Sequence, residues 1–221
     1  MKIIKIIVCV ILLISGIAIM LYPSYNKKKT KNKQDEMITQ LEEQIKDNKG
    51  KNKKQDREYD AKLIMQEVNK LEIEEREDEK NIGVREELLK KQEVIGMINI
   101  PVISTKYAIV EGSDRANIAV AIGHLRGSAW LGGKGNCVLA GHNGGIYGEF
   151  FKNINKLKTN DSVILIDEYG DEYIYIVYEM FKVKPTDTYV TENMKGYILT
   201  LITCTDKGKN RLIVRCKLKK N

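Results

Sequence analysis

The sequence contains only two histidines in 221 residues, His124 and His142, so any histidine-dependent chemistry must use one of them. It is also poor in cysteine pairs. Four cysteines are present, but none forms a C-x-x-C pair and none has a histidine at ligand spacing. This pattern argues against a zinc site. We therefore expect no zinc site.

The cysteines do not form an even set in the part of the chain that follows the N-terminal apolar run. Cys9 lies within that run, which leaves Cys137, Cys204 and Cys216. An odd number argues against a disulfide framework and predicts at least one free, working thiol. Cys137 and Cys216 have apolar or strand-like neighbours and are expected to be inert core thiols, which could pair only if their strands are adjacent.

The sequence also lacks the patterns of nucleic-acid-binding proteins, because no RNP-like, zinc-finger or basic-zipper motif is present. The formal net charge is +7. That excess is spread along the chain and equally suits a protein near the anionic polymers of a cell envelope. We expect no nucleic-acid partner.

An apolar run from Ile6 to Tyr22 lies between lysines. As a helix it would be roughly 26 Å long, the short end of what spans a bilayer. A cleavable signal peptide is the alternative, but no A-x-A-like site follows the run. We therefore predict a single-pass membrane anchor over residues 1–26. Five lysines follow it, and the positive-inside rule alone would place the rest of the chain in the cytoplasm.

Residues 27–92 are dominated by charged and amide side chains, with sparse apolar residues at helical spacing such as Met37, Leu41 and Ile45. This composition predicts a solvated helical or partly disordered stalk. A self-associating coiled coil is the alternative, although the apolar repeat is short for one.

Residues 93–221 alternate short β-rich runs with glycine-rich turns. We expect strands over 94–100, 107–110, 136–140, 162–167, 172–183, 197–203 and 211–218, with a short helical piece over Gly148–Leu157. Seven or eight strands at this spacing predict an all-β domain, a closed or nearly closed β-barrel.

Three side chains at strand ends are the candidates for chemistry. Cys204 ends an apolar strand, and Arg211 begins the next strand after a short turn that brings it back beside Cys204. His142 follows a third apolar strand. A thiol needs a base or a cation to activate it, and arginine suits an anionic intermediate. If these ends meet at the barrel rim, they form a nucleophilic site.

The same residues carry a family resemblance. Leu199-Thr-Leu-Ile-Thr-Cys204 resembles the T-L-x-T-C signature of sortases, and Leu139-Ala-Gly-His142 resembles their A-G-H element. The segments Leu157–Val163, Val183–Val190 and Ile95–Pro101 are similar to three further sortase elements in the same order. The pattern around His124 and Gly133–Asn136 looks closest to class D-type sortases, with class A or B left open. The turn from Leu125 to Gly135 lacks the acidic cluster that binds calcium in some sortases, so we expect no metal and no cofactor.

The resemblance implies an eight-stranded sortase barrel behind an N-terminal transmembrane helix and stalk. It implies that Cys204 is the nucleophile, His142 the acid and base, Arg211 the oxyanion-stabilising cation, and Thr203 a substrate contact. The expected substrates are an LPxTG-like sorting signal, cleaved between Thr and Gly, and an amine of a peptidoglycan precursor. The enzyme would sit on the extracellular face of a Gram-positive-type cell membrane and anchor surface proteins to the wall.

Alternatives remain for the catalytic histidine, for the catalytic arginine and for the function of the protein. His124 competes with His142, and Arg215 shares strand parity with Arg211. The sortase motifs favour His142 and Arg211 and give His124 the place of a hydrogen-bonded turn residue. The alternative functions are another cysteine peptidase or transpeptidase acting on wall peptides, or a catalytically silent, membrane-tethered scaffold that binds a peptide.

Overall fold

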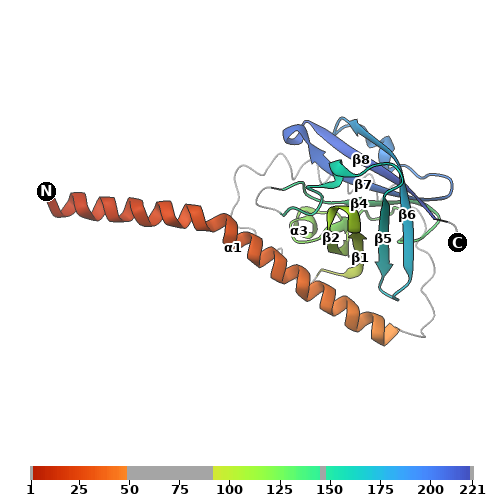
Figure 1. Ribbon diagram of the computed structural model, residues 1–221, viewed down its shortest axis with the longest axis horizontal. Helices are drawn as coiled ribbons and strands as arrows, with labels where there is room; N and C mark the ends of the chain where they lie inside the picture. The colour runs from red at the N-terminus through yellow and green to blue at the C-terminus, as the bar shows by residue number, and fades with distance from the viewer. Residues whose placement is uncertain (1, 49–91, 145–147, 220–221) are drawn as a thin grey trace.

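The computed structural model describes residues 2–48, 92–144 and 148–219. The described chain has two parts, a long helix α1 (Lys2–Asn48) and a closed barrel of eight strands. Figure 1 shows the first half of α1 projecting away from the barrel and the second half running alongside it. Most of the predicted stalk, residues 49–91, lies outside the described residues.

The barrel confirms the predicted fold class. Its strands close in the order β1-β2-β3-β4-β7-β8-β6-β5, and two neighbouring pairs, β2 with β3 and β4 with β7, are parallel. The strands are β1 (Val94–Ile100), β2 (Thr105–Glu111), β3 (Ile122–His124), β4 (Gly135–Ala140), β5 (Ser162–Asp167), β6 (Glu172–Val183), β7 (Tyr197–Thr205) and β8 (Asn210–Leu218).

Two local features differ from the sequence-based prediction. Strand β3 was not expected, because three residues are too few to show an alternating pattern. The short helical piece predicted over Gly148–Leu157 is confirmed only at the 3-10 helix η5 (Ile154–Lys156), and turns precede it. Its apolar residues Phe150, Phe151, Ile154 and Leu157 are buried in the barrel core instead.

Alternation along the strands decides which side chains face the barrel interior. Leu199 and Leu201 of β7 belong to the interior core, as do Leu212, Val214 and Cys216 of β8. Because successive side chains of a strand point to opposite faces, Cys204 and Arg211 lie on the outer face of the barrel wall. The strand ends that were expected to meet at the rim therefore open onto the outside of the barrel.

The second half of α1 packs on the outer face of β1 and β2. Met37 and Leu41 are 2% and 0% exposed and contact Val94, Met97 and Val110. Here the structure differs from the expected solvated helix. The spacing of Met37, Leu41 and Ile45 marks a face that is buried against the barrel.

Truncation of Leu41 is expected to loosen this packing. Leu41→Ala removes a fully buried side chain and should weaken the docking of α1 by about 2–5 kcal/mol. Hydrogen exchange of the amides around residues 34–45 and the melting temperature measure the effect. Gln40→Ala, on an exposed position of the same helix, is the matched control and should change neither quantity. Equal protection in all three proteins would contradict the packing.

Candidate active site

A groove lies on the outer face of the barrel where β4, β7 and β8 meet. Its floor includes Val138 and Ala140 of β4 and Ile202 of β7. Its walls come from α3 (Arg115–Ile118), through Ile118, and from the connection between β6 and β7. His142, Thr203, Cys204 and Arg211 all line this one groove. The structure thus brings together every predicted site residue.

The β6–β7 connection is held over the groove by a buried amide. The Asn136 side chain donates to the carbonyl oxygens of Val190 and Glu192, at 3.1 and 2.9 Å. Its own oxygen accepts a hydrogen bond from Thr200 Oγ1 at 2.7 Å. These contacts seat the short helix η6 (Thr188–Thr191) on the barrel wall. Sequence reasoning gave Asn136 no such role.

Cys204 and Arg211 are direct partners across the β7–β8 ladder. Side chains at paired positions of an antiparallel ladder have Cβ atoms about 4.5–5.5 Å apart, so the Cys204 and Arg211 side chains leave the barrel wall next to each other. The turn between them contains Asp206 and Lys207, both in the left-handed region with φ of 53° and 58°. The Arg211 Nη1 group donates to Gly208 O at 3.3 Å. The predicted hairpin is confirmed.

His142 reaches the same place from β4. Strands β4 and β7 run parallel, with Ala140 paired to Ile202, so His142 follows β4 where Cys204 nears the end of β7. The Gly141 N–H donates to Ile202 O at 3.1 Å. Asn143 Nδ2 donates to Cys204 O at 2.8 Å, which ties the histidine loop to the cysteine strand. This contact of Asn143 was not predicted.

Thr203 also ties these two strands together. Its side chain is 2% exposed, and its hydroxyl donates to Gly141 O at 2.7 Å. The hydroxyl therefore fixes the backbone just before His142. The expected contact between Thr203 and substrate stays a prediction. Because the hydroxyl is already bonded, only the Thr203 atoms that line the groove could make that contact.

The loop that begins at His142 returns to the barrel at Phe151. The Phe151 N–H donates to His142 O at 2.9 Å. The Phe151 ring lies so close to Gly141 that a Cβ atom there would be 2.8 Å from it. Only glycine fits at that position without a shift of the ring, which explains the small residue before His142.

The groove disfavours the charged form of the His142 imidazole. Burial, together with the positive charges of Arg115 and Arg211, lowers the pKa of His142 from 6.5 to about 4. The ring is therefore neutral near pH 7 and can accept a proton. Arg115, on α3, is a further cation near the site that sequence reasoning missed.

This pKa shift predicts a pH dependence of stability. Between pH 6.5 and about 4 the unfolded chain protonates His142 and the folded chain does not. The contribution of His142 to the free energy of unfolding is thus complete above pH 6.5. It is lost as the pH falls toward 4, with a slope of up to ~1.4 kcal/mol per pH unit. Chemical denaturation from pH 8 to 4 measures it. The difference between wild type and His142→Gln should show this slope, and parallel curves would contradict it.

His124 lies outside this groove. It is 1% exposed, with Nδ1 2.7 Å from Glu111 Oε2 and Nε2 3.0 Å from Ala129 O. Its ring packs edge-on against Trp130, with centroids 5.3 Å apart. These contacts favour the structural role expected for His124, although it sits at the end of β3 and not in a turn.

Arg215 likewise makes contacts away from the groove. Its guanidinium lies 5.1 Å from the centroid of the Phe181 ring, and Nη1 is 3.5 Å from Glu179 Oε2. Arg211 lines the groove and Arg215 does not. Its position in the groove thus favours Arg211 over Arg215 as the cation that would stabilise an oxyanion.

The remaining cysteines are free. Cys137 and Cys216 are buried in the barrel core. Their strands β4 and β8 are separated by β7, so the disulfide that was considered between them does not form. Over residues 2–48, 92–144 and 148–219, no group of three or more His, Cys, Asp or Glu side chains is arranged to hold a metal ion.

Comparison with known proteins decides the family. The family model described as Sortase domain matches residues 98–219, more than half of the chain. The chain belongs to the sortase family. The eight-stranded sortase barrel expected from the motifs is therefore confirmed.

Several sortases are similar to this chain. It is 34% identical over 122 residues to Sortase A of Bacillus anthracis and 29% identical over 113 residues to Sortase D of Bacillus subtilis. These matches cover 55% and 49% of this chain but only 57% and 53% of the two relatives. The solved structure of a Clostridium perfringens Sortase D5 transpeptidase is 30% identical, with a TM-score of 0.54, covering 70% of this chain and 98% of that chain.

Proposed function

We propose that this sortase is a membrane-anchored cysteine transpeptidase. Cys204 attacks the bond between Thr and Gly of an LPxTG-like sorting signal, and an amine of a peptidoglycan precursor resolves the acyl-enzyme. The observation that carries the proposal is the convergence of Cys204, His142 and Arg211 in one groove. The similarity to sortases A and D supports the substrate class.

In the first half-reaction, the neutral His142 imidazole accepts the thiol proton as the sulfur attacks the threonine carbonyl carbon. The carbonyl oxygen becomes an oxyanion beside the Arg211 guanidinium, whose fixed positive charge stabilises it. When the intermediate collapses, the C–N bond breaks and the imidazolium protonates the leaving glycine amine. A thioester on Cys204 remains.

In the second half-reaction, the acceptor amine attacks the thioester carbonyl and His142 removes its excess proton. The C–S bond breaks, a new amide forms, and the proton on His142 returns to the Cys204 sulfur. One peptide bond is exchanged for another without oxidation or reduction. Asn143 and Thr203 hold the strand ends that carry the reacting side chains.

The proposed site of action is the extracellular face of the cell membrane. Helix α1 contains one segment long and apolar enough to cross a membrane, and none of that segment is buried against the described protein. Sorting signals and peptidoglycan precursors are presented on the outer face. The lysines that follow the span argue for the opposite orientation by charge alone, and we give the catalytic groove more weight.

A transfer reaction tests this function. The full-length protein in detergent or vesicles is incubated with a panel of LPxTG-containing peptides and an amine. We expect cleavage between threonine and glycine and a new amide between threonine and the amine, both identified by mass spectrometry. A peptide with proline replaced by alanine is the specificity control. If every peptide in the panel stays intact, the proposed function is wrong.

A further inference from the structure

The apolar part of α1 ends close to the barrel. The apolar run ends at Tyr22, and Lys27 lies five residues further along the same helix, past Pro23. At 1.5 Å per residue, Lys27 is only ~7 Å beyond the end of the run. A headgroup layer is roughly 5–8 Å thick, so Lys27 lies at its outer boundary. Exposed lysines at positions 27, 28, 29 and 31 suit contact with anionic lipid headgroups.

Helix α1 meets the barrel at that level, where Asn26 is already buried, and one of its contacts there is with the loop that follows His142. Lys27 Nζ lies 3.3 Å from Glu149 Oε2. Glu149 precedes Phe151, whose N–H donates to His142 O. An exposed ion pair contributes little energy. The pair matters here for what it shows about position. It places the loop that follows His142 next to Lys27, at the membrane surface.

Further contacts along α1 fix the orientation of the barrel. Gln34 is 3% exposed, its amide group donates to Val120 O, and its oxygen accepts from Ala108 N at 2.8 Å. Leu41 is fully buried, and Asn48 Nδ2 donates to Glu168 O at 3.2 Å. Contacts from Lys27 to Asn48 span about 30 Å of helix. A rigid element held along that length cannot pivot freely on the barrel.

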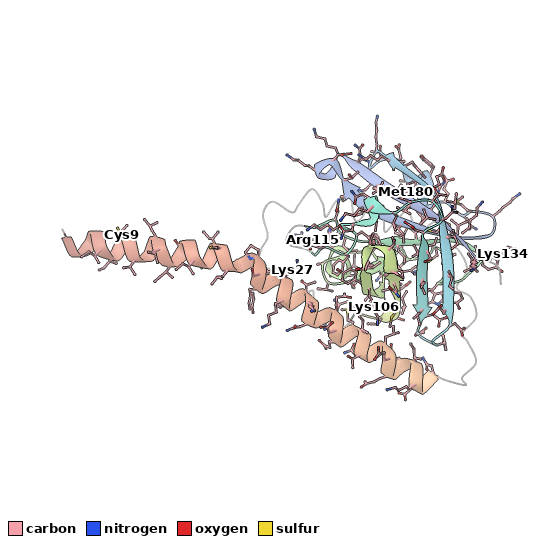
Figure 2. All side chains as sticks on the ribbon, in the orientation of Figure 1. Cys9, Lys27, Lys106, Arg115, Lys134 and Met180 are labelled. Atoms are coloured by element: carbon pink, nitrogen blue, oxygen red, sulfur yellow. The ribbon has the colours of Figure 1, made fainter. Side chains whose placement is uncertain are left out.

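The orientation puts the groove at the membrane end of the barrel. Strands β4 and β7 are parallel and β8 begins at Asn210, opposite Thr205 at the end of β7, so the end of β4, the end of β7 and the start of β8 share one end. Figure 1 shows β8 starting on the side nearer the apolar half of α1 and ending on the side away from it. In Figure 2, Arg115 lies at the barrel end nearer that half and Lys134 at the opposite end.

We infer that the barrel-bound half of α1, from Lys27 to Asn48, is a rigid support that holds the groove end of the barrel against the lipid headgroups. The placement follows from α1 alone, for whichever face of the membrane the barrel occupies. The consequence for catalysis rests on the proposed function. A groove that faces the headgroups should act faster on a peptide held at the same membrane than on the same peptide free in solution, because tethering raises the effective concentration of the peptide at the groove.

Short-range fluorescence quenching tests the placement without any catalysis. In a Cys9→Ala, Cys204→Ala background, a thiol-reactive dye is attached through Lys207→Cys, on the β7–β8 turn, or through Lys134→Cys, at the opposite end. Each protein is reconstituted in phosphatidylcholine–phosphatidylglycerol vesicles that contain a headgroup-labelled quencher lipid. We expect several-fold stronger quenching at position 207. Equal quenching, or stronger quenching at position 134, would overturn the inference.

A substrate comparison tests the consequence for catalysis. Wild type, the double variant Gln34→Ala/Leu41→Ala and the control Gln40→Ala are assayed in vesicles with a lipid-anchored sorting peptide and with the same peptide free in solution. The double variant should lose about 10-fold or more of its activity on the anchored peptide, while its activity on the free peptide and both activities of the control stay unchanged.

Equal losses on both peptides would show that α1 supports the barrel fold and does not position the groove. That result would overturn the inference. If wild type cleaves neither peptide, the proposed function and the consequence for catalysis fail together. Stronger quenching at position 207 would still establish where the groove lies.

Discussion

Cys204→Ala is expected to reduce transpeptidation by at least about 10⁴-fold, because no other thiol lines the groove among the described residues. In the proposed mechanism the sulfur forms the acyl-enzyme, and alanine would leave the groove without this nucleophile. The measurement is the initial rate of amide formation between a sorting peptide and an amine. Cys204 is only partly buried, so the variant should keep the melting temperature of wild type.

Cys216→Ala provides the matched control. Cys216 is a free thiol on the neighbouring strand, but it is buried in the barrel core. This variant should lose some stability and keep turnover at a temperature where it is folded. Turnover by Cys204→Ala would show that the groove binds peptides for some other purpose, as the scaffold hypothesis requires.

Arg211→Ala is expected to lower kcat by about 10²–10³-fold, the usual cost of removing one group that stabilises an oxyanion. Arg211→Lys keeps the positive charge but loses the planar guanidinium, so its kcat should lie between those of wild type and Arg211→Ala. A second effect follows from the position of Arg211. Its charge helps to lower the pKa of His142, so Arg211→Ala should raise that pKa toward 6.5 and move the acid limb of the pH–rate profile to higher pH.

Arg215→Ala separates this role from a general effect of losing an arginine on β8. It removes the contacts with Phe181 and Glu179 but nothing from the groove. We expect a modest loss of stability, an unchanged acid limb and kcat close to that of wild type. A larger loss of kcat in Arg215→Ala than in Arg211→Ala would reverse the assignment.

Much of the site was predictable because it depends on contacts near in sequence. The apolar strand ending at Cys204 and the short turn to Arg211 define a hairpin, and the structure pairs these two residues directly. His142 could be placed only by its motif. Its contact with β7 depends on a parallel pairing between strands 57 residues or more apart, which no local pattern encodes.

The features that were missed depend on partners far along the chain. The spacing of Met37 and Leu41 marked an apolar helix face, but nothing in the sequence identified β1 and β2 as its partner. Asn136 is an ordinary strand residue until the β6–β7 connection lies over it. The outward direction of Cys204 becomes evident only when Leu199 and Leu201 are known to fill the interior.

Cys204 lines one groove with His142 and Arg211, and we propose that its sulfur carries the acyl group between the two substrates. Intact-protein mass spectrometry after brief mixing with a sorting peptide, without an amine, tests it most directly. We expect an adduct with the mass of the peptide up to threonine, located on Cys204 by digestion at low pH and released when an amine is added. An amide product formed with no adduct, or an adduct on a different residue, would show that Cys204 is not the acyl carrier.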